Sequence, residues 1–404
     1  MSSHPRVALW TLVLLATVGG VFILSRRRVH GDGPYIPASD DVVVERLPRA
    51  AGDPRAIEAK RLRRVLAASP RDEEAAARLA RLEIEDARST SDPRHLGYAQ
   101  AALTPWWTEA DPPPAILVLR ATIRQSRHDF PAALADLDRA AAVRPGDPQV
   151  WLTRAVVLSV LGRYDEADRS CTTLTGLSSS LIVTVCRAGV KGITGQAPQA
   201  AAALTRELAS VRPGQDDPWR PWALSVLAEV TGWTGDRAAA ERLSRQALAL
   251  DPDDSYTRAQ LADLLIASGR NSEVPEILRG REQNDGLLLR LAIADTNTRA
   301  PEAAEDVRQV ADRFTAARTR GDSLHGREEA RFELVIRHDP ARALQLARAN
   351  WQVQHEPADA LILLQTALAA RQAAAAAPAL AWARQTGFQD PTVVALCDQL
   401  RSAP

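Results

Sequence analysis

The chain has 404 residues, 50 basic and 50 acidic side chains, and a hydrophobic content of 46%. This length fits either two or three ordinary domains or one long repeat array. Aromatic residues make up only 4%, and no run of alternating Val, Ile and Thr occurs, which argues against a β-rich fold. Only four basic residues precede Asp32, the first acidic residue, so the rest of the chain carries a small acidic excess. That balance argues against nucleic-acid binding, which requires a basic face.

The N-terminal segment over 7–24 is uncharged. As a helix it would span about 27 Å, close to the thickness of the hydrocarbon core of a membrane. Arg26, Arg27 and Arg28 follow directly, and arginines at that place hinder export. We therefore predict an uncleaved, single-pass anchor with a basic flank over 1–28, and the arginines favour a cytoplasmic location for the rest. Residues 29–54, rich in Gly and Pro, are predicted to form a linker.

A helical pattern begins at residue 55 and becomes periodic in its clearest parts, at 114–147 and 148–176. A fixed period of about 34 residues predicts an all-α solenoid of helical hairpins. We expect repeats over 55–280, then degenerate repeats and a C-terminal cap over 281–404. The residues expected to pack or turn the hairpins are Leu117, Ala121, Phe130, Ala133, Trp151, Ala155, Gly162, Tyr164, Ala167, Ala228, Gly235, Ala240, Ala262 and Gly269.

These residues resemble the tetratricopeptide repeat family, and the whole chain looks like bacterial membrane-anchored members of it. The resemblance implies a right-handed superhelix with a concave groove lined by the first helix of each hairpin. It also implies work as an adaptor or scaffold for other proteins.

Transfer of the family's groove positions onto the clear repeats gives a set of candidate contacts: Thr122, Gln125, Gln149, Ser159, Trp222, Glu229, Trp233, Tyr256 and Asp263. Trp222, Trp233 and Tyr256 could form an aromatic patch that anchors a peptide, since such residues dominate binding energy at interfaces. The alternative is that these rings only pack between hairpins. The basic clamp that chaperone-binding members use for a C-terminal carboxylate is not evident.

No catalytic, cofactor or metal motif emerges. The stretch around Gly189, Gly192 and Gly195 lacks the ending of a phosphate loop. The seven histidines form no HExxH motif. Asp251, Asp253 and Asp254 lack the later ligands of a calcium loop. We therefore expect no enzymatic activity, no cofactor and no bound metal.

Cys171 and Cys186 lie on neighbouring predicted helices. Two small buried thiols are the favoured interpretation, because free Cys is commonly a core residue. A disulfide between them is the alternative, and it would indicate the periplasmic side of the membrane.

These patterns together predict a non-enzymatic scaffold that is tethered to the bacterial inner membrane and binds proteins or peptides in its groove. Two alternatives stay open. One is a periplasmic assembly factor that presents apoproteins to a membrane machine, as in cytochrome maturation. The other is a regulatory subunit that recruits an enzyme to the cytoplasmic side of the membrane.

Overall fold

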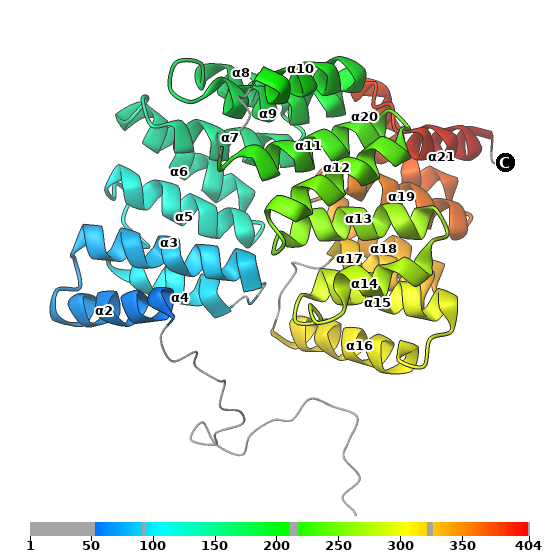
Figure 1. The fold of residues 1–404 in the computed structure, drawn as a ribbon, viewed down its shortest axis with the longest axis horizontal. Coiled ribbons are helices and arrows are strands. Elements are labelled where there is room, and N and C mark those ends of the chain that lie inside the picture. Colours follow the sequence, from blue (N-terminus) through cyan, green and yellow to red (C-terminus); the bar gives the residue numbers. More distant parts are fainter. Residues whose placement is uncertain (1–52, 91, 93, 211–216, 321–325, 403–404) are drawn as a thin grey trace, which may run out of the picture. The chain divides into compact units, whose positions relative to one another are not determined.

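The structure, a computed structural model, describes residues 53–90, 92, 94–210, 217–320 and 326–402 (Figure 1). Over these residues the fold is all-α, and an isolated bridge between Thr175 and Ser178 is their one β-type pairing. None of the described helices is both long enough and apolar enough to cross a membrane. The predicted anchor at 7–24 and the predicted linker as far as residue 52 lie outside the described residues.

The helices pair into consecutive hairpins. The first five are α3 (Glu73–Thr90) with α4 (Arg94–Ala102), α5 (Pro114–Ser126) with α6 (Phe130–Val143), α7 (Pro148–Val160) with α8 (Tyr164–Thr173), α9 (Ser180–Lys191) with α10 (Ala197–Ser210), and α11 (Arg220–Trp233) with α12 (Arg237–Leu250). A lone helix, α2 (Pro54–Ala68), precedes them and packs on α3.

The hairpins continue beyond residue 280, where the sequence pattern weakens. They are α13 (Ser255–Ala267) with α14 (Val274–Leu278), α15 (Asp285–Thr298) with α16 (Ala303–Arg320), α17 (Gly326–Val335) with α18 (Pro340–Trp351), and α19 (Pro357–Ala369) with α20 (Ala377–Thr386), followed by α21 (Pro391–Ser402). Short helical turns lie at η1 (Thr104–Trp106), η2 (Gly192–Gln196), η3 (Asn271–Glu273) and η4 (Ala373–Ala376).

Each hairpin turn from α5 to α20 holds one residue in the left-handed backbone region. Glycine, which adopts this region without steric cost, occupies four of the turns as Gly162, Gly195, Gly235 and Gly269. The other four turns hold His128, Arg299, His338 and Arg371, with φ of 59°, 57°, 56° and 55°. The same turn geometry therefore persists where the sequence has lost its glycine.

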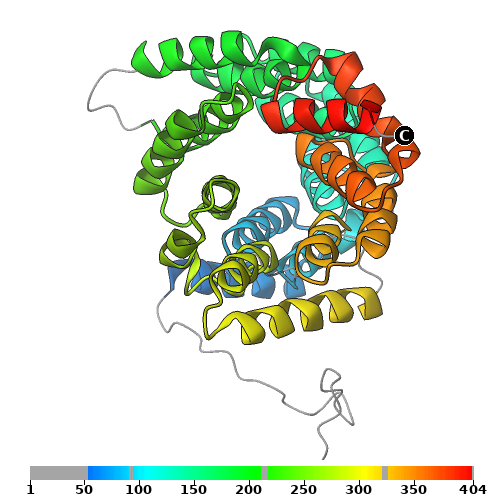
Figure 2. The ribbon, with the colours of Figure 1, turned by 90° about the vertical axis from the view of Figure 1, so that its right-hand side faces the viewer.

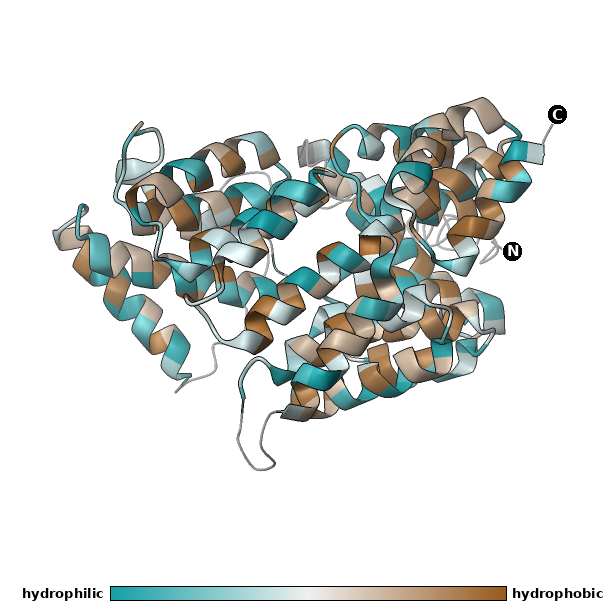
Figure 3. Ribbon diagram, turned by 90° about the horizontal axis from the view of Figure 1, so that it is seen from above, coloured by the Kyte–Doolittle hydropathy of each residue, from teal (hydrophilic) through white to brown (hydrophobic). Residues whose placement is uncertain are grey.

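The residues expected to pack the hairpins lie at helix contacts. Ala121, Ala133, Ala167, Ala240 and Ala262 are fully buried, and Leu117, Phe130, Ala155, Tyr164 and Ala228 nearly so. Trp151 differs, because its ring is only partly buried and its Nε1 donates to the Pro145 carbonyl at 2.7 Å. Figure 3 shows apolar and polar residues interspersed along the helices, as expected when each helix buries one side against its neighbours.

The last helices return to the earlier hairpins and pack against their turns. A Cβ placed on Gly162 would lie 3.4 Å from the His355 ring, one on Gly195 would lie 2.8 Å from the Gly387 carbonyl oxygen, and one on Gly235 would lie 3.1 Å from Pro391. A single hydrophobic cluster accordingly joins α5 to α12 with α17 to α21. The repeat array is thus closed on itself by its C-terminal helices (Figure 2).

Candidate functional site

The first helices of the hairpins form the inner layer of the array. Consecutive first helices contact one another from α3 to α11 and again from α13 to α19, an arrangement typical of superhelical repeats. Side chains on this layer that hairpin packing does not bury are the candidates for contact with a partner.

Glu229 of α11 and Tyr256 of α13, two of the predicted groove residues, meet on the inner layer. The Tyr256 hydroxyl donates to Glu229 Oε1 at 2.6 Å. The tyrosine is 57% exposed, whereas Glu229 is half-buried. We call Glu229 and Tyr256 the inner-layer pair.

The helices opposite the inner-layer pair contribute one cation and two carboxylates. Arg327 of α17 donates to Glu356 Oε2 at 2.8 Å, and the same nitrogen lies 3.3 Å from Asp359 Oδ1. Asp359 is fully buried and also accepts hydrogen bonds from Asn350 at 2.8 Å and Gln354 at 3.0 Å. The buried carboxylate is therefore fixed by several donors and holds the start of α19 in place.

The charges of Glu356 and Arg327 act on the Glu229 carboxyl group of the inner-layer pair. The pKa of Glu229 is raised to about 7, mainly by burial and also by the negative charge of Glu356. The hydrogen bond from Tyr256 and the positive charge of Arg327 lower it, but less strongly than burial raises it. Burial likewise raises the pKa of Asp359 to about 6 despite the attraction of Arg327. Because Glu356 and Arg327 both influence Glu229, residues from α11, α13, α17 and the start of α19 form one charged site.

Asp263 of α13, another predicted groove residue, is held by two guanidinium groups. Arg290 lies 2.7 Å from its Oδ2, and Arg331 lies 2.6 Å from its Oδ1. Burial opposes ionisation, but these two cations outweigh it and hold the pKa of Asp263 below its ordinary range. Its charge is therefore already satisfied within the chain.

The remaining polar groove candidates make local contacts. The half-buried Thr122 and Ser159 donate to carbonyls of their own helices at 2.9 Å. Gln149 is exposed and donates to Thr153 at 3.0 Å, and Gln125 is half-buried. The structure does not bring these four residues into contact with the inner-layer pair.

The predicted aromatic patch is not formed. Trp233 is 9% exposed and packs edge-to-face on Phe388 at 5.4 Å, because the returning C-terminal helices cover it. Trp222 is half-buried on the main hydrophobic cluster, with Trp219 at 6.1 Å. Trp233 is therefore corrected to a packing residue, and of the three rings only that of Tyr256 stays largely open.

The seam between the last helices and the earlier hairpins is polar as well as apolar. The Tyr164 hydroxyl donates to the His355 carbonyl at 3.0 Å and accepts from Trp382 Nε1 at 2.7 Å. The His355 amide donates to the Val160 carbonyl at 2.8 Å. We call Tyr164, His355 and Trp382 the seam; it fixes the chain next to Glu356.

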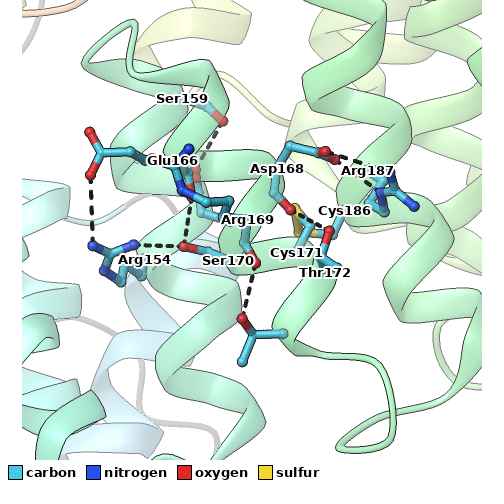
Figure 4. Close-up of a disulfide and its surroundings, with 12 residues drawn as sticks. Arg154, Ser159, Glu166, Asp168, Arg169, Ser170, Cys171, Thr172, Cys186 and Arg187 are labelled. Atoms are coloured by element: carbon cyan, nitrogen blue, oxygen red, sulfur yellow. Dashed lines mark hydrogen bonds and ion pairs between the residues drawn. A yellow bond between two sulfur atoms is a disulfide. The ribbon is translucent and has the colours of Figure 1, made fainter.

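Cys171 of α8 and Cys186 of α9 are joined by a disulfide (Figure 4). The sequence favoured two free thiols, but the packing of neighbouring hairpins brings the two Cα atoms to 5.6 Å, within the range a disulfide spans. An ion pair between Asp168 and Arg187, at 3.0 Å, links the same two helices. Cys397 is free and buried.

The segments that partly match phosphate-binding, calcium-binding or metal-binding patterns have structural roles. Gly192 lies under the Trp233 ring, where a Cβ would come within 2.6 Å. Asp254 caps α13 by accepting from the Tyr256 and Thr257 amides. Glu83, Asp86 and His95 have ligand atoms within 4.8 Å of one another, but Arg63 contacts Glu83 and Arg55 contacts Asp86. These three residues therefore form an ion-pair network that needs no metal for charge balance.

Sequence reasoning missed Arg327, Arg331, Glu356 and Asp359. All four lie beyond residue 280, where the period needed to assign inner-layer positions is lost. A signal that could have found Glu356 and Asp359 is the Pro357 start of α19, which follows Glu356 and precedes Asp359 as in a capping box.

No family model and no curated protein matches the chain. Among solved structures, it is similar to a tetratricopeptide repeat protein from Parabacteroides merdae, at 16% identity over 71% of this chain and 98% of that one, with a TM-score of 0.35. It is similar to Cut9-Hcn1, a hetero-tetramer of the APC/C, at 12% identity over 85% and 86%, with a TM-score of 0.30. Yeast Tom70 shows 11% identity over 81% and 88%, with a TM-score of 0.28.

Such identities concern the fold alone. The fold itself rests on this chain's own features, which are consecutive helix pairs and a left-handed residue in each turn from α5 to α20. The turn glycines Gly235 and Gly269 also keep the spacing of about 34 residues that is typical of these hairpins. The chain is therefore an array of consecutive helical hairpins, similar to tetratricopeptide repeats in the spacing of its clearest turns.

Proposed function

We propose that the chain is a non-enzymatic scaffold that binds partner proteins on its inner layer. One observation carries the proposal: side chains of the inner layer stay accessible while the repeat-packing residues are buried. Tyr256 is 57% and Val156 of α7 is 42% exposed, and Gln149, two helical turns before Val156 on the same side of the helix, is exposed too. Tyr256 lies beside Glu229 on this layer, and aromatic side chains contribute strongly to binding energy when a partner buries them.

Site-specific crosslinking tests this proposal. A photoreactive amino acid replaces Val156 on the inner layer, and in a matched variant it replaces the exposed Arg206 on the outer helix α10. We expect discrete crosslinked partners in cells from position 156 and none from position 206. Equal crosslinking from both positions, or none from either, would refute a partner site on the inner layer.

We further propose that the array is tethered to the bacterial inner membrane through 7–24 and lies on the periplasmic side. The Cys171–Cys186 disulfide supports this side, because disulfides persist in oxidising compartments. A periplasmic assembly factor that presents other proteins to a membrane machine fits this arrangement. The competing candidate is a cytoplasmic regulatory subunit, which the arginines at 26–28 favour.

A reporter fused after Pro404 separates the two candidates. A fusion that is active only in the periplasm supports the assembly factor, and one active only in the cytoplasm supports the regulatory subunit. If the fusion is recovered in the soluble fraction without detergent, the proposed attachment to the membrane is wrong. A shift in electrophoretic mobility on reduction, absent in a Cys171→Ala, Cys186→Ala variant, reports the disulfide in the same cells.

A further inference from the structure

Glu229 is a carboxylate without a cation. Its Oε1 accepts from Tyr256, and among the described residues no Arg, Lys or His forms an ion pair with it. Asp263, in the next hairpin, has two arginines at 2.7 and 2.6 Å, so the lack of a partner is specific to Glu229 rather than general to the inner layer.

The surroundings of Glu229 carry excess negative charge. Glu356 and Asp359 share a single guanidinium group, that of Arg327, at 2.8 and 3.3 Å. Glu356 repels the Glu229 carboxylate and Arg327 attracts it only in part. A further cation beside Glu229 would therefore reduce the excess negative charge of the site.

Tyr256 adds an open aromatic face beside that carboxylate. Its side chain is 57% exposed, and its hydroxyl is directed to Glu229. A cation placed over a tyrosine ring gains electrostatic energy. A guanidinium group can stack on the ring and donate to a carboxylate together, which a lysine ammonium does less well.

We infer that the inner-layer pair Glu229 and Tyr256 binds an arginine side chain on an extended segment of a partner protein. The inference rests on the proposed function, and it names the chemistry of the partner. The arginine occupies the place of the missing cation: it donates to Glu229 and stacks on Tyr256.

Binding of this kind depends on pH, because the arginine binds the ionised form of Glu229. With a pKa of about 7 in the free protein, a substantial fraction of Glu229 is protonated at neutral pH. Affinity should thus increase about tenfold between pH 6 and pH 8, because the ionised fraction of Glu229 rises from about one tenth to about nine tenths across that range. The groups that act on Glu229 from the packed elements are Tyr256, Glu356 and Arg327.

The test measures binding of a fluorescent ten-residue glycine–serine peptide with two arginines to the purified full chain at low salt. The comparison peptide carries citrulline, a neutral analogue of arginine, at both places. We expect the citrulline peptide to bind at least tenfold more weakly. Glu229→Gln should weaken the arginine peptide about tenfold and reduce the increase in affinity between pH 6 and pH 8, and Tyr256→Leu should weaken it several-fold.

Glu276→Gln is the matched control, since Glu276 is exposed on the outer helix α14 and loses the same charge. It should bind like the wild type. Circular dichroism verifies that each variant is folded. Equal binding of both peptides, no binding of either, or unchanged binding by Glu229→Gln would overturn the inference. If the crosslinks from position 156 persist in that case, the scaffold function stands without the arginine site.

Discussion

The seam that closes the array gives a sharp test of the fold. Tyr164→Phe removes one hydroxyl that accepts from Trp382 Nε1 at 2.7 Å and donates to the His355 carbonyl at 3.0 Å. Trp382 is 7% exposed, so its N–H has little access to water once the hydroxyl is gone. An unsatisfied buried donor costs about 1–3 kcal/mol, and the second lost bond adds about 0.5–1.5 kcal/mol. We expect a total destabilisation of about 2–4 kcal/mol.

Hydrogen exchange is the suitable measurement, because repeat arrays do not unfold in one cooperative step. The opening free energy of α18 to α21 should fall by that amount in Tyr164→Phe, with a smaller effect on α3 and α4. Tyr98→Phe is the control, since Tyr98 is 49% exposed and its ring contacts with His95 and Arg63 survive the change. A loss below about 0.5 kcal/mol at the seam would show that the last helices are not held by these bonds.

Three other predictions follow from single features. Arg371→Gly should raise the opening free energy of α19 and α20, measured by hydrogen exchange, by about 0.5–1 kcal/mol, because it relieves a left-handed residue. Gly269→Ala should lower that of α13 and α14 by about 1 kcal/mol, although a Cβ there meets nothing within 4 Å. Reduction of the Cys171–Cys186 disulfide, which closes a sequence separation of 15, should lower stability by up to about 3 kcal/mol in the wild type and not in the double alanine variant. The pKa of Glu229 is raised to about 7 in the folded protein, so its stabilising contribution is complete below about pH 4.5 and is lost as the pH rises through 7. Glu229→Gln should therefore reduce the fall in unfolding free energy over that window by about 1–2 kcal/mol. An unchanged dependence of the unfolding free energy on pH would contradict this prediction.

The hairpins over 114–176 and 220–280 could be predicted because the spacing of their packing residues is retained there. Gly235 and Gly269 lie one repeat period apart, and both adopt the left-handed region. Beyond 280 the turn residues become Arg299, His338 and Arg371, and their spacing becomes irregular. Each of these turns still requires one left-handed residue. Non-glycine residues adopt that conformation at an energetic cost, and without the glycine the turn cannot be recognised in the sequence.

For the same reason, only part of the candidate site could be predicted from the sequence. Glu229, Tyr256 and Asp263 lie in hairpins with a clear period, so the family register assigned them to the inner layer. Their counterparts Arg327 and Arg331 lie in the hairpin whose turn residue is His338. Trp233 was assigned to the groove because no local pattern reveals that Phe388, far along the chain, packs on its ring.

Closure also ties the seam to the site. The His355 backbone is fixed at its amide by Val160 and at its carbonyl by Tyr164, and the next residue is Glu356, which acts on Glu229 and binds Arg327. An open solenoid can change its curvature, which would move α11 and α13 relative to α17 and α19. With the seam formed, that motion requires breaking buried hydrogen bonds, so α11 and α13 are held in one arrangement relative to α17 and α19. Tyr164→Phe should therefore weaken binding of the arginine peptide, although Tyr164 is not one of the residues inferred to contact it. If hydrogen exchange shows that the seam is open in this variant and the peptide still binds as it does to the wild type, closure of the array is not needed for binding.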